Sequence, residues 1–139
     1  MGQHEAEAEK EKGNAAYKRK DFETAIAHYD KAIELDQTCI TYYTNKAAVY
    51  YEKGDYDQCV KKCDKAVEIG RENRADFRLI AKAFSRAAHA FEKKEDYPNA
   101  KKYFDKSRSE SRQPDVEKSA RALEKLMKEK EGLAYIDPE

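Results

Sequence analysis

One short pattern occurs three times in this chain, and it constrains the fold more than any other feature. An Asp followed by an aromatic ring precedes two small residues that are seven positions apart. The first small residues of the three copies are Ala25, Cys59 and Ala100, so that successive copies are 34 and 41 residues apart. A period of 34 residues is typical of stacked helix–turn–helix units. The pattern therefore predicts an all-α, right-handed solenoid of three helix pairs, with an insertion of seven residues before the third copy.

The composition fits a helical domain and excludes several classes of protein. Hydrophobic and charged residues each make up 40% of the 139 residues, and there are only three Pro and five Gly. Such a chain is too apolar for disorder and too polar for a membrane protein. The 28 basic residues equal the 28 acidic ones, whereas nucleic-acid binders usually carry a basic excess. We therefore expect neither nucleic acid nor a membrane as partner.

The cysteines and the start of the chain indicate a reducing, cytoplasmic location. The first residues are polar and acidic without an apolar stretch, and the three cysteines are an odd number. Cys59 and Cys63 are four apart on one helix, but no second Cys or His pair has ligand spacing, so we predict two core thiols and no metal. Motifs for phosphate-binding loops or nucleophilic triads are missing from the sequence, which argues against an enzyme or a cofactor.

Periodicity and breakers predict one domain over residues 1–139 with seven helices, at residues 5–20, 22–35, 38–53, 56–69, 72–94, 97–109 and 114–131. The first six make three repeats, near 6–39, 40–73 and 74–114, and the last helix caps the third repeat. Residues 132–139 are expected to begin a connector, with the native protein continuing beyond Glu139.

Turn residues support these boundaries. Asp21, Asp55 and Asp96 are each expected to cap the helix that follows. Gly54 and Gly70 are expected just beyond the third and fourth helices, where glycine adopts left-handed backbone geometry at little cost. The insertion is expected to lengthen the fifth helix at its start.

A candidate site follows from the first helix of each pair, since these helices line the concave face of a solenoid. Five polar residues should project there: Lys10, Asn14, Asn45, Lys82 and Arg86. Asn45 and Arg86 are 41 residues apart and so occupy equivalent positions in successive repeats. Together the five residues offer many donors and a charge of +3. A chain-terminal Asp, with two carboxylates close together, is the kind of ligand that matches.

These positions resemble the two-carboxylate clamp of tetratricopeptide co-chaperones. Residues 70–74 and the closing residues 133–138 are also similar to the middle clamp domain of heat-shock organising proteins. The resemblance implies an adaptor that holds the Glu-Glu-Val-Asp C-terminus of cytosolic heat-shock chaperones. It implies a preference for the Met-Glu-Glu-Val-Asp tail of the ninety-kilodalton chaperone.

The same resemblance implies further groove residues for the Val, Glu and Met side chains of the tail: Tyr17, Thr41, Ala48 and Glu52. His89 departs from the family, which usually has Asn at this position. Its imidazole is able to donate a hydrogen bond that depends on pH, or it packs as a half-buried ring.

Two alternatives stay open at this level. The first is a clamp that prefers the seventy-kilodalton chaperone, whose tail shares the last four residues. The second is a structural scaffold that associates with itself through its convex or end surfaces.

Overall fold

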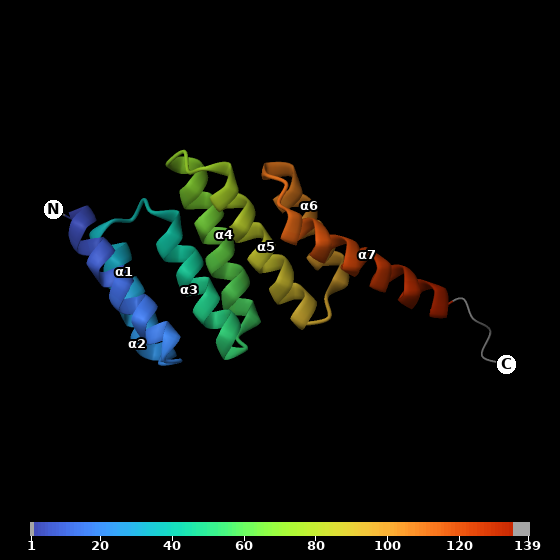
Figure 1. The fold of residues 1–139 in the computed structure, drawn as a ribbon, viewed down its shortest axis with the longest axis horizontal. Coiled ribbons are helices and arrows are strands. Elements are labelled where there is room, and N and C mark those ends of the chain that lie inside the picture. Colours follow the sequence, from blue (N-terminus) through green and yellow to red (C-terminus); the bar gives the residue numbers. More distant parts are fainter. Residues whose placement is uncertain (1, 135–139) are drawn as a thin grey trace.

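The computed structural model describes residues 2–134, which form helices joined by short turns, with no strand among them. The helices are α1 (Gly2–Lys18), α2 (Phe22–Leu35), α3 (Ile40–Lys53), α4 (Tyr56–Glu72), α5 (Phe77–Lys93), α6 (Tyr97–Glu110) and α7 (Pro114–Ala134). Figure 1 shows them stacked in chain order from one end of the molecule to the other. The predicted all-α solenoid is confirmed. Within these residues, no helix combines the length and apolar character that crossing a bilayer requires.

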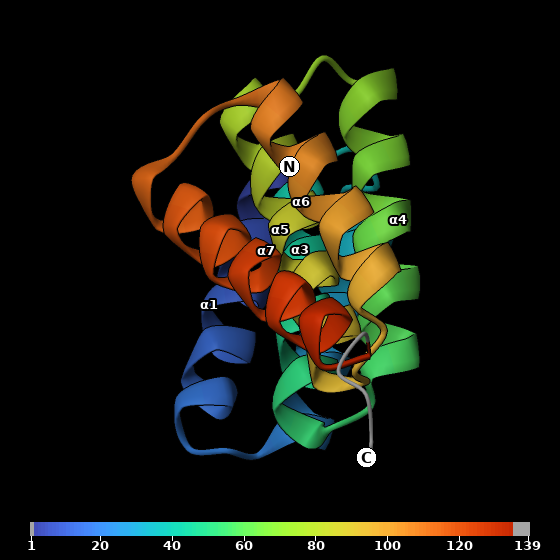
Figure 2. The same cartoon turned by 90° about the vertical axis from the view of Figure 1, so that its right-hand side faces the viewer.

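The helices pack as antiparallel pairs, and each pair contacts the next. α1 lies on α2, α3 on α4 and α5 on α6, while α2 contacts α3 and α4 contacts α5. α7 packs on α6 and crosses the C-terminal end of the stack (Figure 2). Because α3 also contacts α5, the first helices of successive pairs form a continuous inner layer.

Small residues on the second helices allow this close packing. Ala25, Cys59 and Ala100 are fully buried, and so are their partners seven positions later. The large rings between them, Tyr29 on α2 and Phe104 on α6, are 2% and 1% exposed. Burial of such a side chain stabilises the fold by about 1.5–3 kcal/mol. The repeated pattern therefore marks the buried residues through which the helices of each pair pack together.

The turn inside each pair has the same construction. The carboxylates of Asp21, Asp55 and Asp96 accept backbone N–H groups three residues on, at Thr24, Gln58 and Asn99, as predicted. The preceding residue has left-handed backbone geometry in every copy: φ is 62° at Lys20, 82° at Gly54 and 60° at Glu95. Only the second copy uses glycine there, so the other two turns carry backbone strain.

The turn between α4 and α5 differs from the prediction. Gly70 lies inside α4, not beyond it; Asn73 caps the helix and Arg74 has a φ of 54°. A Cβ at Gly70 would lie 2.8 Å from Cδ1 of Ile40 and 3.1 Å from Cγ1 of Ile80. Gly70 is therefore needed for close approach of three helices, and this packing outweighs the tendency of glycine to end α4.

The seven inserted residues are spread over α4, α5 and the turn after α5, and are not confined to the start of α5. α4 and α5 have 17 residues each, whereas α2 and α3 have 14. The turn at 94–96 is also one residue longer than the turn at 54–55. The expected start of the fifth helix at residue 72 is therefore wrong, and α5 begins at Phe77 with Asp76 as its cap.

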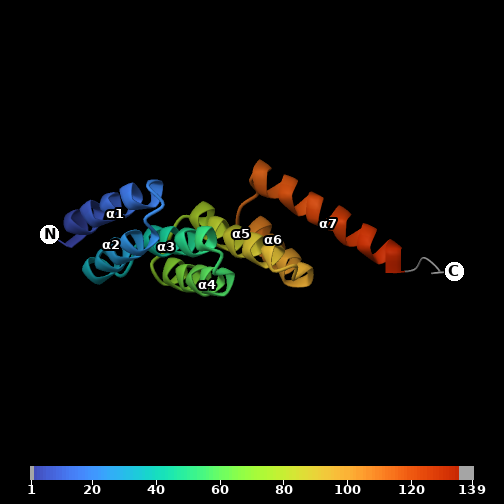
Figure 3. The ribbon, with the colours of Figure 1, turned by 90° about the horizontal axis from the view of Figure 1, so that it is seen from below.

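α7 closes the stack and then extends away from it (Figure 3). Val116, Ala120 and Leu123 are buried against α6. Arg108 of α6 holds the two helices together through Glu117, at 2.9 Å, and Glu124, at 3.2 Å. The helix continues to Ala134, three residues beyond the predicted end. Of the predicted connector, residues 135–139 lie outside the described residues.

Candidate functional site

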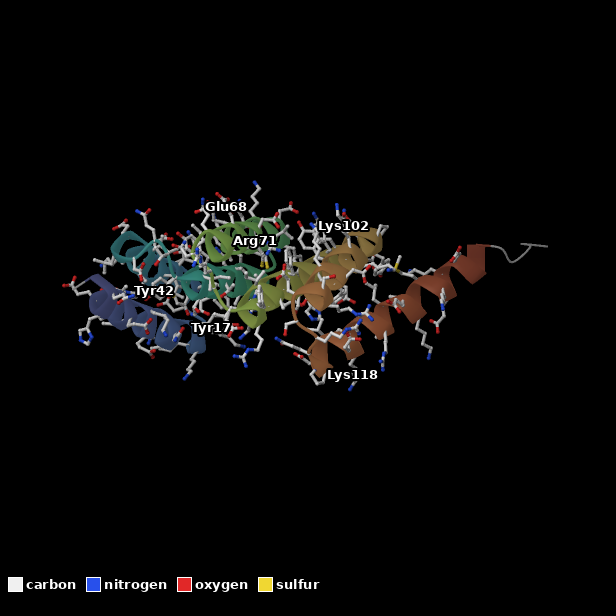
Figure 4. All side chains as sticks on the ribbon, turned by 90° about the horizontal axis from the view of Figure 1, so that it is seen from above. Tyr17, Tyr42, Glu68, Arg71, Lys102 and Lys118 are labelled. Carbon is white, nitrogen blue, oxygen red and sulfur yellow. The ribbon has the colours of Figure 1, made fainter. Side chains whose placement is uncertain are left out.

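The first helices present one face of the molecule and the second helices the other. In Figure 4, Tyr17 and Lys118, from α1 and α7, project on the side opposite Glu68, Arg71 and Lys102, from α4 and α6. Figure 3 shows α1 and α7 rising on either side of α3 and α5. Candidate ligand groups on α1, α3 and α5 therefore share one concave face.

Three of the five predicted residues line a single pocket on this face. Asn14 of α1, Asn45 of α3 and Arg86 of α5 surround a pocket of about 190 Å³. Tyr29 of α2 also lines it, because its ring packs against Gly13 of α1 and its hydroxyl reaches Asn14. Residues that are 31 and 41 positions apart in the sequence are thus brought together by the repeat.

Hydrogen bonds orient the amides in this pocket. Nδ2 of Asn45 donates to Oδ1 of Asn14 at 3.4 Å, and the hydroxyl of Tyr29 donates to the same oxygen at 2.6 Å. With its oxygen occupied twice, Asn14 keeps its own NH₂ group for a ligand. Nε of Arg86 is buried and, uniquely among buried side-chain nitrogens and oxygens of residues 2–134, has no partner. Such a donor costs about 1–3 kcal/mol unless an acceptor reaches it.

A larger cavity of about 500 Å³ adjoins the pocket through Arg86, which lines both. Four residues of α5 line it, Lys82, Ser85, Arg86 and His89, together with Tyr51 of α3. The remaining wall comes from Gln113, just before α7, and from Asp115 and Val116 in its first turn. Lys82 and Arg86 are one turn apart, so their charged ends point into the same space.

Lys10 is placed differently from the other four residues. It lies one turn before Asn14 on α1, but it lines neither cavity. Its ammonium is 2.8 Å from a carboxylate oxygen of Glu7 and 3.7 Å from one of Glu11. The bond to Glu7 raises the pKa of Lys10, so the side chain is charged. A ligand carboxylate would have to compete with Glu7 for this cation.

The residues implied for the rest of the groove are divided. Tyr17 and Ala48 line the smaller pocket. Burial raises the pKa of Tyr17, the Glu52 carboxylate adds to the effect and Arg86, which lines the same pocket, opposes it. Thr41 lines neither cavity; its carbonyl accepts the hydroxyl of Thr44 at 3.1 Å.

His89 packs against α6 and also lines the larger cavity. Its ring meets Phe104 edge-on, with centroids 5.1 Å apart, and Nδ1 lies 3.0 Å from a carboxylate oxygen of Glu92. The side chain is still 39% exposed and lines the larger cavity. Packing therefore sets the orientation of the ring, and the other ring nitrogen is left for a ligand.

Sequence reasoning missed six residues that line these cavities: Tyr29, Tyr51, Ser85, Gln113, Asp115 and Val116. Tyr29 sits on the packing stripe of α2, and the pattern gives no sign that its hydroxyl reaches α1. The residues at the start of α7 come near α5 only because the chain reverses after α6.

Among residues 2–134, no three His, Cys, Asp or Glu side chains come together as a metal site. Cys59 and Cys63 are buried with Ala47 and Ala87, as core thiols.

A family model described as tetratricopeptide repeat matches residues 37–109, and one described as TPR repeat matches residues 13–54. The chain belongs to the tetratricopeptide repeat family. Within it, the chain is 58% identical over 132 residues to stress-induced-phosphoprotein 1 of Caenorhabditis elegans and 52% identical over 134 residues to the Hsp70-Hsp90 organizing protein of Triticum aestivum. These alignments cover 95% and 94% of this chain but only 41% and 23% of the relatives. The resemblance to heat-shock organising proteins is confirmed.

Solved structures agree with this placement. The N-terminal domain of stress-induced protein-1 from C. elegans is 56% identical, with a TM-score of 0.83, over 89% of this chain and 98% of that one. The TPR2AB domain of yeast Sti1, solved as a complex with an Hsp90 peptide, is 42% identical with a TM-score of 0.94. That alignment covers 97% of this chain and 52% of the yeast chain.

Proposed function

We propose that this domain is a co-chaperone adaptor that holds the C-terminal Met-Glu-Glu-Val-Asp tail of Hsp90 in its concave groove, without catalysis. The observation that supports it most is the meeting of Asn14, Asn45 and Arg86, from three successive first helices, in one pocket. A terminal Asp offers two carboxylates, and the pocket and the adjoining cavity offer amide and cationic donors to both. The proposed cytoplasmic location follows from this partner.

Five residues form the proposed clamp: Lys10, Asn14, Asn45, Lys82 and Arg86. A ligand carboxylate near Arg86 would accept a hydrogen bond from its unpaired Nε. The cost of leaving this buried donor unpaired in the free domain would then be removed on binding, which favours the complex. Lys10 would break its ion pair with Glu7 and form one with a carboxylate of the ligand. Charge-assisted bonds contribute about 1.5–3 kcal/mol each, and the cost of ordering a flexible tail reduces their sum to a dissociation constant of roughly 1–10 μM.

The proposed subsites for the side chains upstream of Asp are Tyr17, Thr41, Ala48, Glu52 and His89. Tyr17 and Ala48 supply apolar surface next to the clamp, and His89 supplies a ring nitrogen in the larger cavity. The preference for Hsp90 is supported by the similarity to the yeast Sti1 domain that was solved with an Hsp90 peptide.

The decisive experiment is a calorimetric titration with the free-acid and the C-terminally amidated pentapeptide Met-Glu-Glu-Val-Asp. The clamp predicts that amidation abolishes binding, because it removes one of the two terminal carboxylates. Equal affinity for both peptides would refute the proposal.

A second titration separates the two chaperones, with Met-Glu-Glu-Val-Asp against Ile-Glu-Glu-Val-Asp. Tighter binding of the Met peptide supports Hsp90, and equal or reversed affinities favour Hsp70 or no preference. The alternative of a self-associating scaffold predicts a sedimentation coefficient that rises with protein concentration and no effect of the peptide.

A further inference from the structure

The larger cavity contains one carboxylate among cationic side chains. Lys82 and Arg86 line it from α5, and Asp115 faces them from the first turn of α7. Neither Lys82 nor Asp115 takes part in an ion pair within residues 2–134, where fifteen pairs are formed. Asp115 is therefore a free negative charge beside the cations that would receive an acidic ligand.

The start of a helix favours an acidic residue, so Asp115 also has a plain structural use. Its neighbour Glu117, in the same turn, provides a comparison. The Glu117 carboxylate is bound by Arg108 at 2.9 Å and by Arg112 at 3.5 Å, and it joins α7 to α6. Asp115 makes no such contact and lines the cavity instead. Stabilisation of the helix start explains why residue 115 is acidic. It does not explain why this carboxylate lines the same cavity as Lys82 and Arg86.

We propose that Asp115 is a specificity-determining residue that limits how much negative charge the groove accepts. This inference rests on the proposed function. Counting Lys82, Arg86 and Asp115, the side chains that line the larger cavity carry a net charge of +1, where without Asp115 it would be +2. A single ligand carboxylate balances this charge. A phosphate or a second carboxylate at the same place meets the repulsion of Asp115, and release of the correct ligand is faster than a wholly cationic cavity would allow.

The expected effect follows from Coulomb's law. Removing one negative charge about 7 Å from an anionic ligand, in surroundings close to water, should tighten binding about threefold at low ionic strength. Salt of about 500 mM reduces the Debye length to a few ångströms, so the gain should fall below about 1.5-fold there. The gain should also be smaller for a ligand with fewer charges.

The test uses three variants of the whole domain and the free-acid pentapeptide Met-Glu-Glu-Val-Asp, titrated by calorimetry at low and at high salt. Asp115→Asn removes the charge, and Asp115→Glu keeps it. Glu129→Gln removes the same charge from an exposed position on the far part of α7. Only Asp115→Asn should bind about threefold more tightly at low salt, with circular dichroism and Tm showing that it is folded.

The inference is overturned if Asp115→Asn binds the peptide with unchanged or lower affinity, or if Glu129→Gln shows the same gain. If Asp115→Asn unfolds, the peptide affinity of Asp115→Glu is compared with that of wild type at the two salt concentrations. A change in affinity at constant charge would contradict an electrostatic role. Failure of wild type to bind any pentapeptide would instead refute the proposed function.

Discussion

The phenol of Tyr29 donates a 2.6 Å hydrogen bond to Oδ1 of Asn14, across the interface between α2 and α1. Burial of the phenol raises the pKa of Tyr29 to about 12, so the hydroxyl keeps its proton and remains a donor throughout the physiological range. The bond determines which end of the Asn14 amide faces the pocket. A residue of the packing stripe therefore also positions a residue of the proposed clamp.

Replacing Tyr29 with Phe should weaken peptide binding while the fold is kept. The change removes one hydrogen bond, which contributes about 0.5–1.5 kcal/mol to stability, and frees the Asn14 amide to rotate. We expect the dissociation constant to rise several-fold in calorimetry, with a small fall in Tm.

Tyr103→Phe is the matched control, because its hydroxyl donates at 3.0 Å to Asp64 on the convex face. It should lower Tm by a similar amount and leave peptide affinity unchanged. Equal affinities of Tyr29→Phe and wild type would show that Tyr29 is structural only.

Lys82→Ala and Arg86→Ala should each weaken peptide binding by about 1.5–3 kcal/mol, because each removes a charge-assisted hydrogen bond. Lys82 is exposed and Arg86 is half-buried with no ion pair among the described residues, so the helical content measured by circular dichroism should not change. Lys102→Ala removes the same charge from the convex face (Figure 4) and should bind normally. Wild-type affinity in either groove variant would contradict the clamp.

Glu95→Gly should stabilise the domain, by about 0.5–1 kcal/mol. Glu95 has a φ of 60° in the turn before α6, a geometry that is strained for any residue except glycine. Part of the gain is lost because glycine is more flexible in the unfolded chain. Chemical denaturation measures the difference. Gly54→Ala, at the equivalent turn with φ of 82°, should destabilise the domain. Opposite changes in the free energy of unfolding for the two variants are expected if both positions have left-handed backbone geometry.

Ala66→Leu should destabilise the domain by about 1–3 kcal/mol, since it adds volume to a packed core. Ala66 is fully buried with Ile40 and Phe84 where α3, α4 and α5 meet. Ala122→Leu on the exposed side of α7 tests the substitution itself and should have little effect. An unchanged Tm for Ala66→Leu would contradict close packing at this position, because α3, α4 and α5 would then have room for the larger side chain.

Asp76 makes part of the stability depend on acid pH. Hydrogen bonds from the side chain and backbone of Arg78 lower the pKa of Asp76 from 3.8 to about 2. A lowered pKa in the folded state means that the stabilisation is complete above about pH 4 and disappears as the pH falls towards 2. The difference in Tm between wild type and Asp76→Asn should therefore be constant from neutral pH to about 4 and shrink below it. A difference that persists at pH 2 would contradict this assignment.

The repeat and its helices could be predicted from the residue pattern, and so could several of the groups that line the two cavities of the inner face. Local signals suffice for this: Asp21, Asp55 and Asp96 cap helices through their own backbone neighbours, and Ala25 and Ala32 lie seven residues apart on one helix face. Residues such as Asn45 and Arg86 are equivalent by repeat arithmetic, so their convergence could be predicted without coordinates.

Tertiary structure alone decided the rest, because those contacts join parts of the chain that no period relates. Gly70 continues α4 since it fits against Ile40 and Ile80, a packing fact that outweighs the tendency of glycine to end helices. Tyr29 reaches Asn14 only through the docking of α2 on α1, and Asp115 reaches the groove only because α7 folds back over α5. Side-chain placement of this kind is set by the packing of whole helices, which the pattern of residues does not specify.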